Sequence, residues 1–129
     1  MTGYLLDTNA VLYTLLDDAR LSPRARIAIA SGPNFISVAS YWEVVLKSMK
    51  GKLDVGDPGI WWTQALKNLV ATPLHLRPDH IEQVCSLPPI HKDPFDRILI
   101  AQATAESLTL VTMDSEIPLY ASQSFQVIV

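Results

Sequence analysis

Residues 4–16 read YLLDTNAVLYTLL. A short apolar run here stops at an acid, and an amphipathic segment follows. Tyr4-Leu5-Leu6 is typical of a short buried strand, and it ends at Asp7. From Asn9 to Leu16 the apolar residues recur at helical spacing, which predicts a helix. A strand followed directly by a helix is the unit from which parallel sheets are built.

The same alternation continues along the rest of the chain. Ser22-Pro23 is an N-cap followed by proline at the first helical position, and Gly32-Pro33 ends the helix that starts there. The pattern predicts further strands at 35–38, 72–76, 108–112 and 125–129, and further helices at 23–31, 40–51, 58–70, 78–85 and 94–106. Two prolines within 87–92 make that segment irregular. We therefore expect one α/β domain over residues 1–129, with a mainly parallel sheet and helices on both faces.

The composition excludes several classes of protein. Apolar residues make up 49% of the 129 residues and charged residues 18%, as in a globular domain with a substantial core. The net charge of −3 excludes a broad basic surface for nucleic acid, and the single cysteine, Cys85, excludes a disulfide framework. No apolar run approaches the ~20 residues that span a bilayer, and residues 1–7 lack the basic start of a signal peptide. We expect a cytoplasmic protein without a membrane partner.

Acidic side chains follow the expected strands, at the edge where parallel sheets bind ligands. Asp7 follows the first strand, Asp114 comes two residues after the 108–112 strand, and Glu43 lies one turn into the helix after the 35–38 strand. Asp93 and Asp96 stand at the start of the 94–106 helix. Five acids at one edge repel one another, so such a cluster persists when a cation neutralises it or when protons are retained. Oxygen ligands without a cysteine or histidine set favour Mg²⁺ or Mn²⁺ over zinc.

Each acid taken alone has a plainer interpretation as a helix cap. Asp93 precedes a proline as an N-cap does, and Asp96 suits the dipole of the same helix. Ser40 and Glu43 have the spacing of a capping box. Capping does not explain why several acids converge on one sheet edge, so the interpretation as a site is favoured.

Side chains near the acids are candidates for supporting roles. Three of them can hydrogen-bond a metal ligand or a phosphate, namely Thr8, Asn9 and Thr112. Ordinary turn and cap bonding is the alternative for these three. Six basic residues are candidates for a rim that holds phosphate, or else form a solvated helix face: Arg20, Arg24, Arg26, Lys47, Lys50 and Lys52.

The acids and their neighbours form a series of motifs: Leu5-Leu6-Asp7-Thr8-Asn9, Ser37-Val38-Ala39-Ser40-Tyr41-Trp42-Glu43-Val44, His91-Lys92-Asp93-Pro94-Phe95-Asp96-Arg97, Ala101-Gln102-Ala103 and Leu110-Val111-Thr112-Met113-Asp114. In this order and at this spacing, over roughly residues 4–128, the sequence resembles the PIN-domain family. Within that family it resembles the VapC-like toxins of bacterial toxin–antitoxin systems. An aspartate after a strand is common by itself, but four such pieces in order are specific.

The resemblance implies a three-layer α/β/α PIN-like fold and a metal-dependent endoribonuclease that hydrolyses RNA with Mg²⁺ or Mn²⁺. It places the catalytic, metal-binding acids at Asp7, Glu43, Asp96 and Asp114. Asp93 matches the extra aspartate of the Asp-Pro-Phe-Asp-Arg subgroup. The resemblance also implies a homodimer and a small cognate antitoxin, which has a DNA-binding N-terminal part and a C-terminal segment that covers the active site.

Two alternatives stand beside this interpretation. A receiver domain of a two-component regulator is also a small α/β domain with an acidic Mg²⁺ pocket. That family pattern has two adjacent acids after the first strand and a lysine after the last, whereas Asp7 stands alone and no lysine follows Lys92. The second alternative is a PIN-like module that binds RNA or protein without catalysis, against which the intact set of acids argues.

Overall fold

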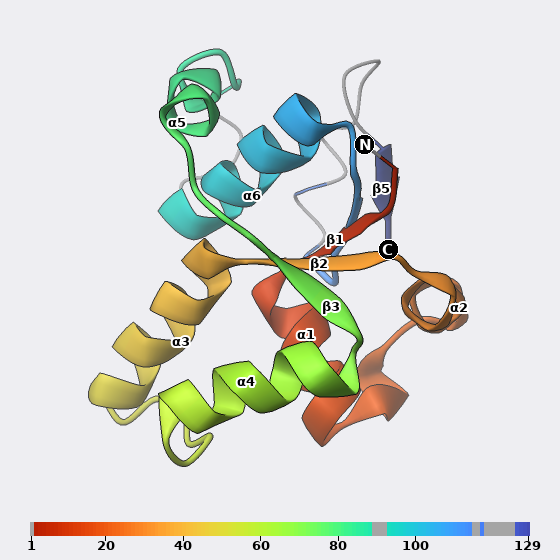
Figure 1. Cartoon of the computed structure of the whole chain (residues 1–129), viewed down its shortest axis with the longest axis vertical. Helices are drawn as coiled ribbons and strands as arrows, with labels where there is room; N and C mark the ends of the chain where they lie inside the picture. The colour runs from red at the N-terminus through yellow and green to blue at the C-terminus, as the bar shows by residue number, and fades with distance from the viewer. Residues whose placement is uncertain (1, 89–92, 115–116, 118–125) are drawn as a thin grey trace.

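A sheet of parallel strands lies at the centre of the protein (Figure 1). The structure is a computed structural model that describes residues 2–88, 93–114, 117 and 126–129. Within these residues the strands are β1 (Tyr4–Leu6), β2 (Asn34–Ser37), β3 (Ala71–Leu74), β4 (Thr109–Val111) and β5 (Gln126–Ile128). Their order is β3-β2-β1-β4-β5, and neighbouring strands are parallel throughout. The prediction of a mainly parallel sheet is confirmed, with β5 as an edge strand.

Helices connect the strands and cover both faces of the sheet. They are α1 (Thr8–Leu16), η1 (Asp18–Arg20, a 3-10 turn), α2 (Pro23–Ser31), α3 (Val38–Met49), α4 (Pro58–Asn68), α5 (Pro78–Val84) and α6 (Pro94–Glu106). The cap signals of α2 act as the sequence predicts, because the Ser22 hydroxyl accepts a hydrogen bond from the Ala25 N–H and Gly32 ends the helix at a φ of 58°. In the described part of the chain, none of the helices has the length and apolar character needed to cross a membrane.

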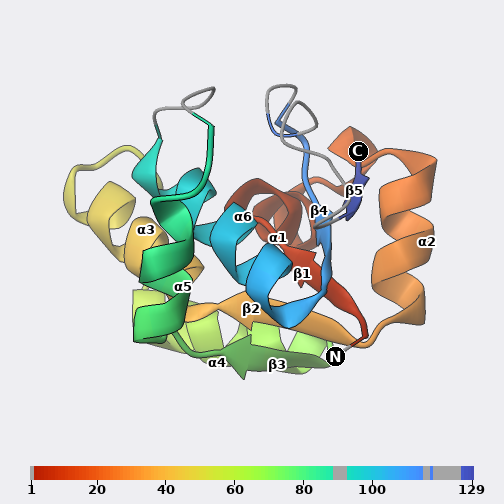
Figure 2. The same cartoon turned by 90° about the horizontal axis from the view of Figure 1, so that it is seen from above.

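The alternation of side chains along the strands divides the core into two layers. Leu6, Ile36 and Val111 pack on one face with apolar residues of α1, α2, α3 and α4. Leu5 and Leu110 point to the opposite face and pack against α6. Figure 2, viewed from the side of α5 and α6, shows α1 and α4 behind the sheet. The arrangement is the three-layer α/β/α fold that the resemblance implied.

The chain enters α3 two residues earlier than the sequence predicts. Strand β2 ends at Ser37, whose hydroxyl accepts a hydrogen bond from the Ala39 N–H and caps the helix. Ser40 and Glu43 therefore lie inside α3, and the capping box expected of them is wrong. Of the segment expected to be irregular, residues 87 and 88 lie in no helix or strand and residues 89–92 lie outside the described residues.

Candidate metal centre

The register of the sheet brings Asp7 and Thr112 to one edge. Leu6 pairs with Ile36 on one side and with Val111 on the other, so the carboxyl ends of these three strands lie level. Asp7 directly follows β1 and Thr112 directly follows β4. The parallel pairing thus places two residues far apart in the sequence side by side at the carboxyl edge, where α/β sheets bind their ligands.

Asp7 is held through both carboxylate oxygens and its backbone N–H, and it is only 3% exposed. Its Oδ1 accepts a hydrogen bond of 2.7 Å from the Ala10 N–H and so caps α1, and its Oδ2 accepts one of 2.5 Å from the Thr112 hydroxyl. The Asp7 N–H donates to the Val111 carbonyl at 3.0 Å. Asp7 is therefore both a helix cap and a rigidly oriented carboxylate, and the two interpretations of this acid are compatible.

Burial raises the pKa of the Asp7 carboxyl from its ordinary value of 3.8 to about 6. Desolvation is the largest cause, and the nearby Glu43 carboxylate adds to it. Hydrogen bonds from Thr112, Ala10 and Met113 act in the opposite direction and lower the pKa. At neutral pH the carboxylate is ionised at a cost in free energy, which a cation bound nearby would offset.

A second hydrogen-bonded group joins α1 to α3. The Thr8 hydroxyl donates to Glu43 Oε1 at 2.5 Å, and Thr8 Oγ1 lies 3.0 Å from Ser40 Oγ. Glu43 Oε2 forms an ion pair of 3.0 Å with Lys47 Nζ, one turn along α3. Thr8, Ser40 and Glu43 are buried, so these contacts fix the orientation of the Glu43 carboxylate.

The remaining three acids come from α6 and from the segment after β4. Asp93 caps α6 by accepting a hydrogen bond of 2.9 Å from the Phe95 N–H, and Asp96 lies in the first turn of that helix. The Asp114 N–H donates to the Thr112 hydroxyl oxygen at 3.0 Å. The capping expected of Asp93 is thus present, and Thr112 contacts both Asp7 and Asp114.

The acidic side chains line one cavity of about 130 Å³. The described residues that line it are Asp7, Thr8, Asn9, Glu43, Lys47, Asp93, Asp96 and Asp114. The structure therefore brings together all the acids singled out in the sequence, and it places Thr112 behind Asp7 rather than on the cavity wall. The volume corresponds to about four water molecules at roughly 30 Å³ each, which is space for metal ions and phosphate oxygens.

Lys47 is the basic residue among those described on this wall. Of the six residues considered for a phosphate-holding rim, it is the one that reaches the cavity. Arg26 lines a different cavity, and the Arg20 guanidinium lies 4.1 Å from the centre of the Tyr13 ring. The position of Lys47, four residues after Glu43 on a predicted helix, is the sequence signal that indicates its pairing with that acid.

The donor set fits a hard divalent cation. Five carboxylates and one ammonium group line the cavity, and histidine and cysteine are absent from the described lining. Carboxylate oxygens are the protein ligands that Mg²⁺ and Mn²⁺ prefer. The desolvated Asp7 carboxylate, with a pKa of about 6, supports the same conclusion because its charge lacks a cationic partner among its hydrogen bonds to Thr112 and Ala10.

Comparison with known proteins assigns the chain to a family. The model of the PIN domain matches residues 4–122. The chain belongs to the PIN-domain family. The order of its sheet also excludes the receiver-domain alternative, because receiver domains have the flavodoxin-like strand order 2-1-3-4-5.

Solved structures share the fold of this PIN domain over nearly its whole length. With VapBC2 from Rickettsia felis bound to a promoter DNA fragment, the TM-score is 0.69 at 14% identity, covering 99% of this chain and 98% of that chain. With a toxin–antitoxin complex from Klebsiella pneumoniae, it is 0.64 at 18% identity, covering 98% and 96%. With FitAcB from Neisseria gonorrhoeae, it is 0.66 at 18% identity, covering 98% and 96%. No curated protein matched the sequence.

A second group of titratable side chains in this PIN domain lies between α5 and α6. Single ligand atoms of Asp79, His80 and Glu106 lie within 4.8 Å of one another. The Arg77 guanidinium already pairs with both carboxylates, at 2.9 Å from Asp79 and 2.7 Å from Glu106. His80 Nδ1 accepts a hydrogen bond from the Arg77 N–H, and its Nε2 lies 3.3 Å from Glu106. The group therefore stabilises the contact between α5 and α6, and the Arg77 guanidinium supplies the positive charge that its carboxylates need.

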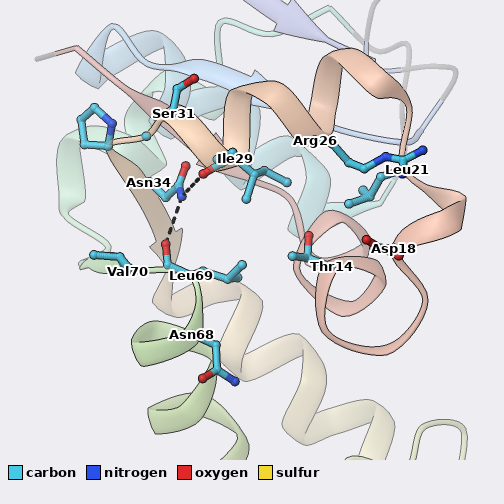
Figure 3. A pocket seen from close by; sticks show the side chains of 13 residues that line it. Thr14, Asp18, Leu21, Arg26, Ile29, Ser31, Asn34, Asn68, Leu69 and Val70 are labelled. Atoms are coloured by element: carbon cyan, nitrogen blue, oxygen red, sulfur yellow. Dashed lines mark hydrogen bonds between the residues drawn. The ribbon is translucent and has the colours of Figure 1, made fainter.

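A larger cavity of this PIN domain, about 670 Å³, opens at the opposite edge of the sheet (Figure 3). It lies among α1, η1, α2, the start of β2 and the end of α4. At its floor the Asn34 amide N–H₂ donates to the carbonyls of Ile29 and Leu69 at 2.8 and 3.0 Å and so ties two helix ends together. Its described charged residues are one acid and one base, Asp18 and Arg26, so the chemistry of a metal site is concentrated in the smaller cavity.

Proposed function

We propose that this PIN domain is a Mg²⁺- or Mn²⁺-dependent endoribonuclease and the toxin of a toxin–antitoxin pair. The observation that carries the proposal is the 130 Å³ cavity, in which five carboxylates converge from the ends of β1 and β4 and from α3 and α6. Such a concentration of negative charge is unfavourable in the empty protein and favourable around a divalent cation. The identity of the cation and the RNA specificity belong to the proposal.

The residues divide into ligands and the groups that orient them. Asp7, Asp96, Asp114 and Glu43 would hold the cation, directly or through water, since Mg²⁺ usually keeps several waters. A divalent ion bound there would supply a deprotonated water at neutral pH and would neutralise charge on the leaving oxygen of a phosphodiester. Asp93, the N-cap of α6, adds negative charge to the lining of the cavity.

The hydroxyls determine how the ligands point. Thr112 donates to Asp7 and leaves that carboxylate one fixed orientation, and Thr8 does the same for Glu43. A ligand whose rotamer is fixed before the cation arrives loses little conformational entropy on binding. Asn9, exposed on the cavity wall, is placed to hydrogen-bond a phosphate oxygen or a bound water.

Solved structures with the same fold support a proposal for the partner. The solved structures that share the fold include a complex named as toxin–antitoxin and others named as VapBC and FitAcB. We propose a small antitoxin whose C-terminal segment covers the acidic cavity, and a homodimeric toxin in the cytoplasm. A basic side chain from the antitoxin would complement five carboxylates at the point where the cation binds.

The test is cleavage of total RNA by the purified protein with Mn²⁺ or Mg²⁺, with a chelator and the Asp7→Asn variant as negative controls. Asp54→Asn is the matched control, because it removes one aspartate charge from an exposed loop. Discrete fragments that disappear with chelator and with Asp7→Asn, but not with Asp54→Asn, are expected. Metal binding without any cleavage would contradict the nuclease function and favour the alternative, a non-catalytic PIN-like binding module.

A further inference from the structure

The indole of Trp42 is exposed next to Glu43, one of the acids that line the cavity. It is 58% exposed. The other Phe, Tyr and Trp side chains in the described part of the chain are buried or partly buried. Trp42 directly precedes Glu43 on α3. Its ring contacts that of Phe95 edge to face, with 5.3 Å between centroids and 78° between planes, and Phe95 directly precedes Asp96 on α6. The pair therefore spans the two helices whose acids form one wall of the cavity.

The size of the cavity determines which part of a substrate lies outside it. About 130 Å³ accommodates metal ions and phosphate oxygens, but not a nucleobase in addition. Consecutive helical residues diverge by about 100°, so Trp42 points sideways from the direction of Glu43 and does not enter the cavity itself. A base attached to a phosphate in the cavity would lie outside the cavity, where the exposed ring of Trp42 is available for stacking.

The other tryptophans are already covered. Trp61 is buried in the core, and Trp62 is stacked on Tyr41 with 4.9 Å between centroids and 7° between planes. Phe95 fixes the orientation of Trp42 while more than half of its surface stays open, so a base can stack without first ordering the ring. Lys47, whose side chain is 43% exposed on the same helix, adds a positive charge for the adjoining phosphates.

From this geometry we propose that Trp42, held by Phe95, stacks on one base next to the cleaved phosphate and so contributes to substrate selection. The proposal rests on the proposed nuclease function. Because bases in a duplex already stack on their neighbours, Trp42 favours an unpaired base at that position. Aromatic stacking on a base corresponds to about a tenfold effect on binding when the ring is removed.

The experiment measures cleavage of a short synthetic RNA of mapped cleavage site by wild type, Trp42→Ala and Trp42→Phe. Met49→Ala is the matched control, because Met49 is 78% exposed on the same helix. We expect Trp42→Ala to raise KM about tenfold with kcat within about twofold, Trp42→Phe to recover most of the loss, and Met49→Ala to change neither. Trp42→Ala with unchanged KM and kcat overturns the proposal.

Abasic substrates identify the interaction as stacking. One abasic position beside the cleaved phosphate should slow the wild type by the same factor of about ten and leave Trp42→Ala unaffected, because the contact is already lost. If the abasic position also slows Trp42→Ala, so that the two losses of rate multiply, the proposal is overturned. So does a Trp42→Ala protein that changes its oligomeric mass or loses only antitoxin affinity, since either result assigns the ring to a protein contact.

A binding measurement separates this proposal from the nuclease function. Quenching of tryptophan fluorescence by an unstructured oligoribonucleotide requires neither cleavage nor a mapped cleavage site. If the wild type fails to cleave, the nuclease function fails. Quenching that is present in Met49→Ala and lost in Trp42→Ala then still supports stacking, whereas unchanged quenching in Trp42→Ala contradicts it.

Discussion

The hydroxyl of Thr112 donates to the carboxylate of Asp7 across 105 residues of sequence, and this one contact joins the ends of β1 and β4 at the acidic cavity. Both residues are buried. The same hydroxyl oxygen accepts from the Asp114 N–H, so a single threonine positions two of the acids. The contact makes the geometry of the proposed metal centre dependent on the strand pairing of the sheet.

Replacing Asp7 by asparagine should abolish RNA cleavage and at the same time stabilise the metal-free protein. The raised pKa of Asp7 shows that its charge opposes folding at pH 7, by roughly 3 kcal/mol for a shift of about two pKa units. A less favourable amide hydrogen bond costs about 1 kcal/mol, so the free energy of unfolding should rise by about 1–2 kcal/mol. Urea denaturation in EDTA at pH 7 measures it. A large destabilisation would contradict the assigned cause of the pKa shift.

The stability gained by Asp7→Asn should depend on pH. The Asp7 carboxyl has a folded pKa of about 6 and an ordinary value of 3.8, so the native state binds more protons between these values. The wild type therefore loses stability as pH rises from about 4 to above 6, and the variant lacks this loss. Denaturation curves of both proteins in EDTA should converge as pH falls from 7 to 4. Parallel curves would show that Asp7 does not titrate in this range.

The affinity for Mn²⁺ should depend on the same Asp7 carboxyl, but it should rise with pH where stability falls. A proton on Asp7 competes with the cation, so Mn²⁺ affinity should weaken by up to about tenfold per pH unit below 6 and become nearly constant above 7. Calorimetric titration of the wild type at pH 5, 6, 7 and 8 checks this. Asp54→Asn, which leaves the cavity intact, should follow the wild-type profile, and a pH-independent affinity would exclude Asp7 as a ligand.

Removal of the Thr112 hydroxyl should alter the pH profile of cleavage as well as stability. In Thr112→Val the hydrogen bond that lowers the pKa of Asp7 is lost, so that pKa rises further. The acid limb of kcat/KM should move up by about one pH unit, and the free energy of unfolding should fall by about 1–3 kcal/mol because buried polar groups lose their partner. Thr112→Ser retains the hydroxyl and should keep the wild-type profile.

Arg77→Ala should destabilise the protein at pH 7 and much less at low pH. Arg77 pairs with Asp79 and Glu106, and hydrogen bonds from Arg77 are the largest cause of the lowered pKa of both acids. Their stabilisation is present above the ordinary pKa values and is lost as pH falls. Thermal unfolding at pH 7 and pH 3 measures the difference. The exposed Arg24, replaced by alanine in a control variant, should show no such pH dependence.

Local signals in the sequence were sufficient for much of the fold. The helix predicted at 94–106 occurs at Pro94–Glu106, because Asp93 and the following proline specify its start. The cap at Ser22 and the stop at Gly32 are equally local. Ser37 and Ser40 were not distinguishable in this way, since both can cap a helix. The choice depends on where β2 ends, and the pairing of Ser37 with Leu74 on β3 determines that end.

The candidate site was predictable where strand order alone brings residues together. Asp7 and Asp114 follow adjacent strands, so their proximity follows from the topology. The hydrogen bonds that orient the acids were not predictable, because Thr8 meets Glu43 through the packing of α1 on α3. The guanidinium of Arg97 donates to the carbonyls of Val84 and Leu87, which is likewise a consequence of tertiary packing.

The central position of β1 has a consequence for protein synthesis. β1 precedes the other described strands in the chain, but it is completed by β2 on one side and by β4 on the other. A nascent chain that ends before β4 contains Asp7 without Thr112, and before α6 it also lacks Asp96. The carboxylates assemble only after most of the chain has been translated. The proposed nuclease activity would therefore be absent from a nascent chain that ends before β4.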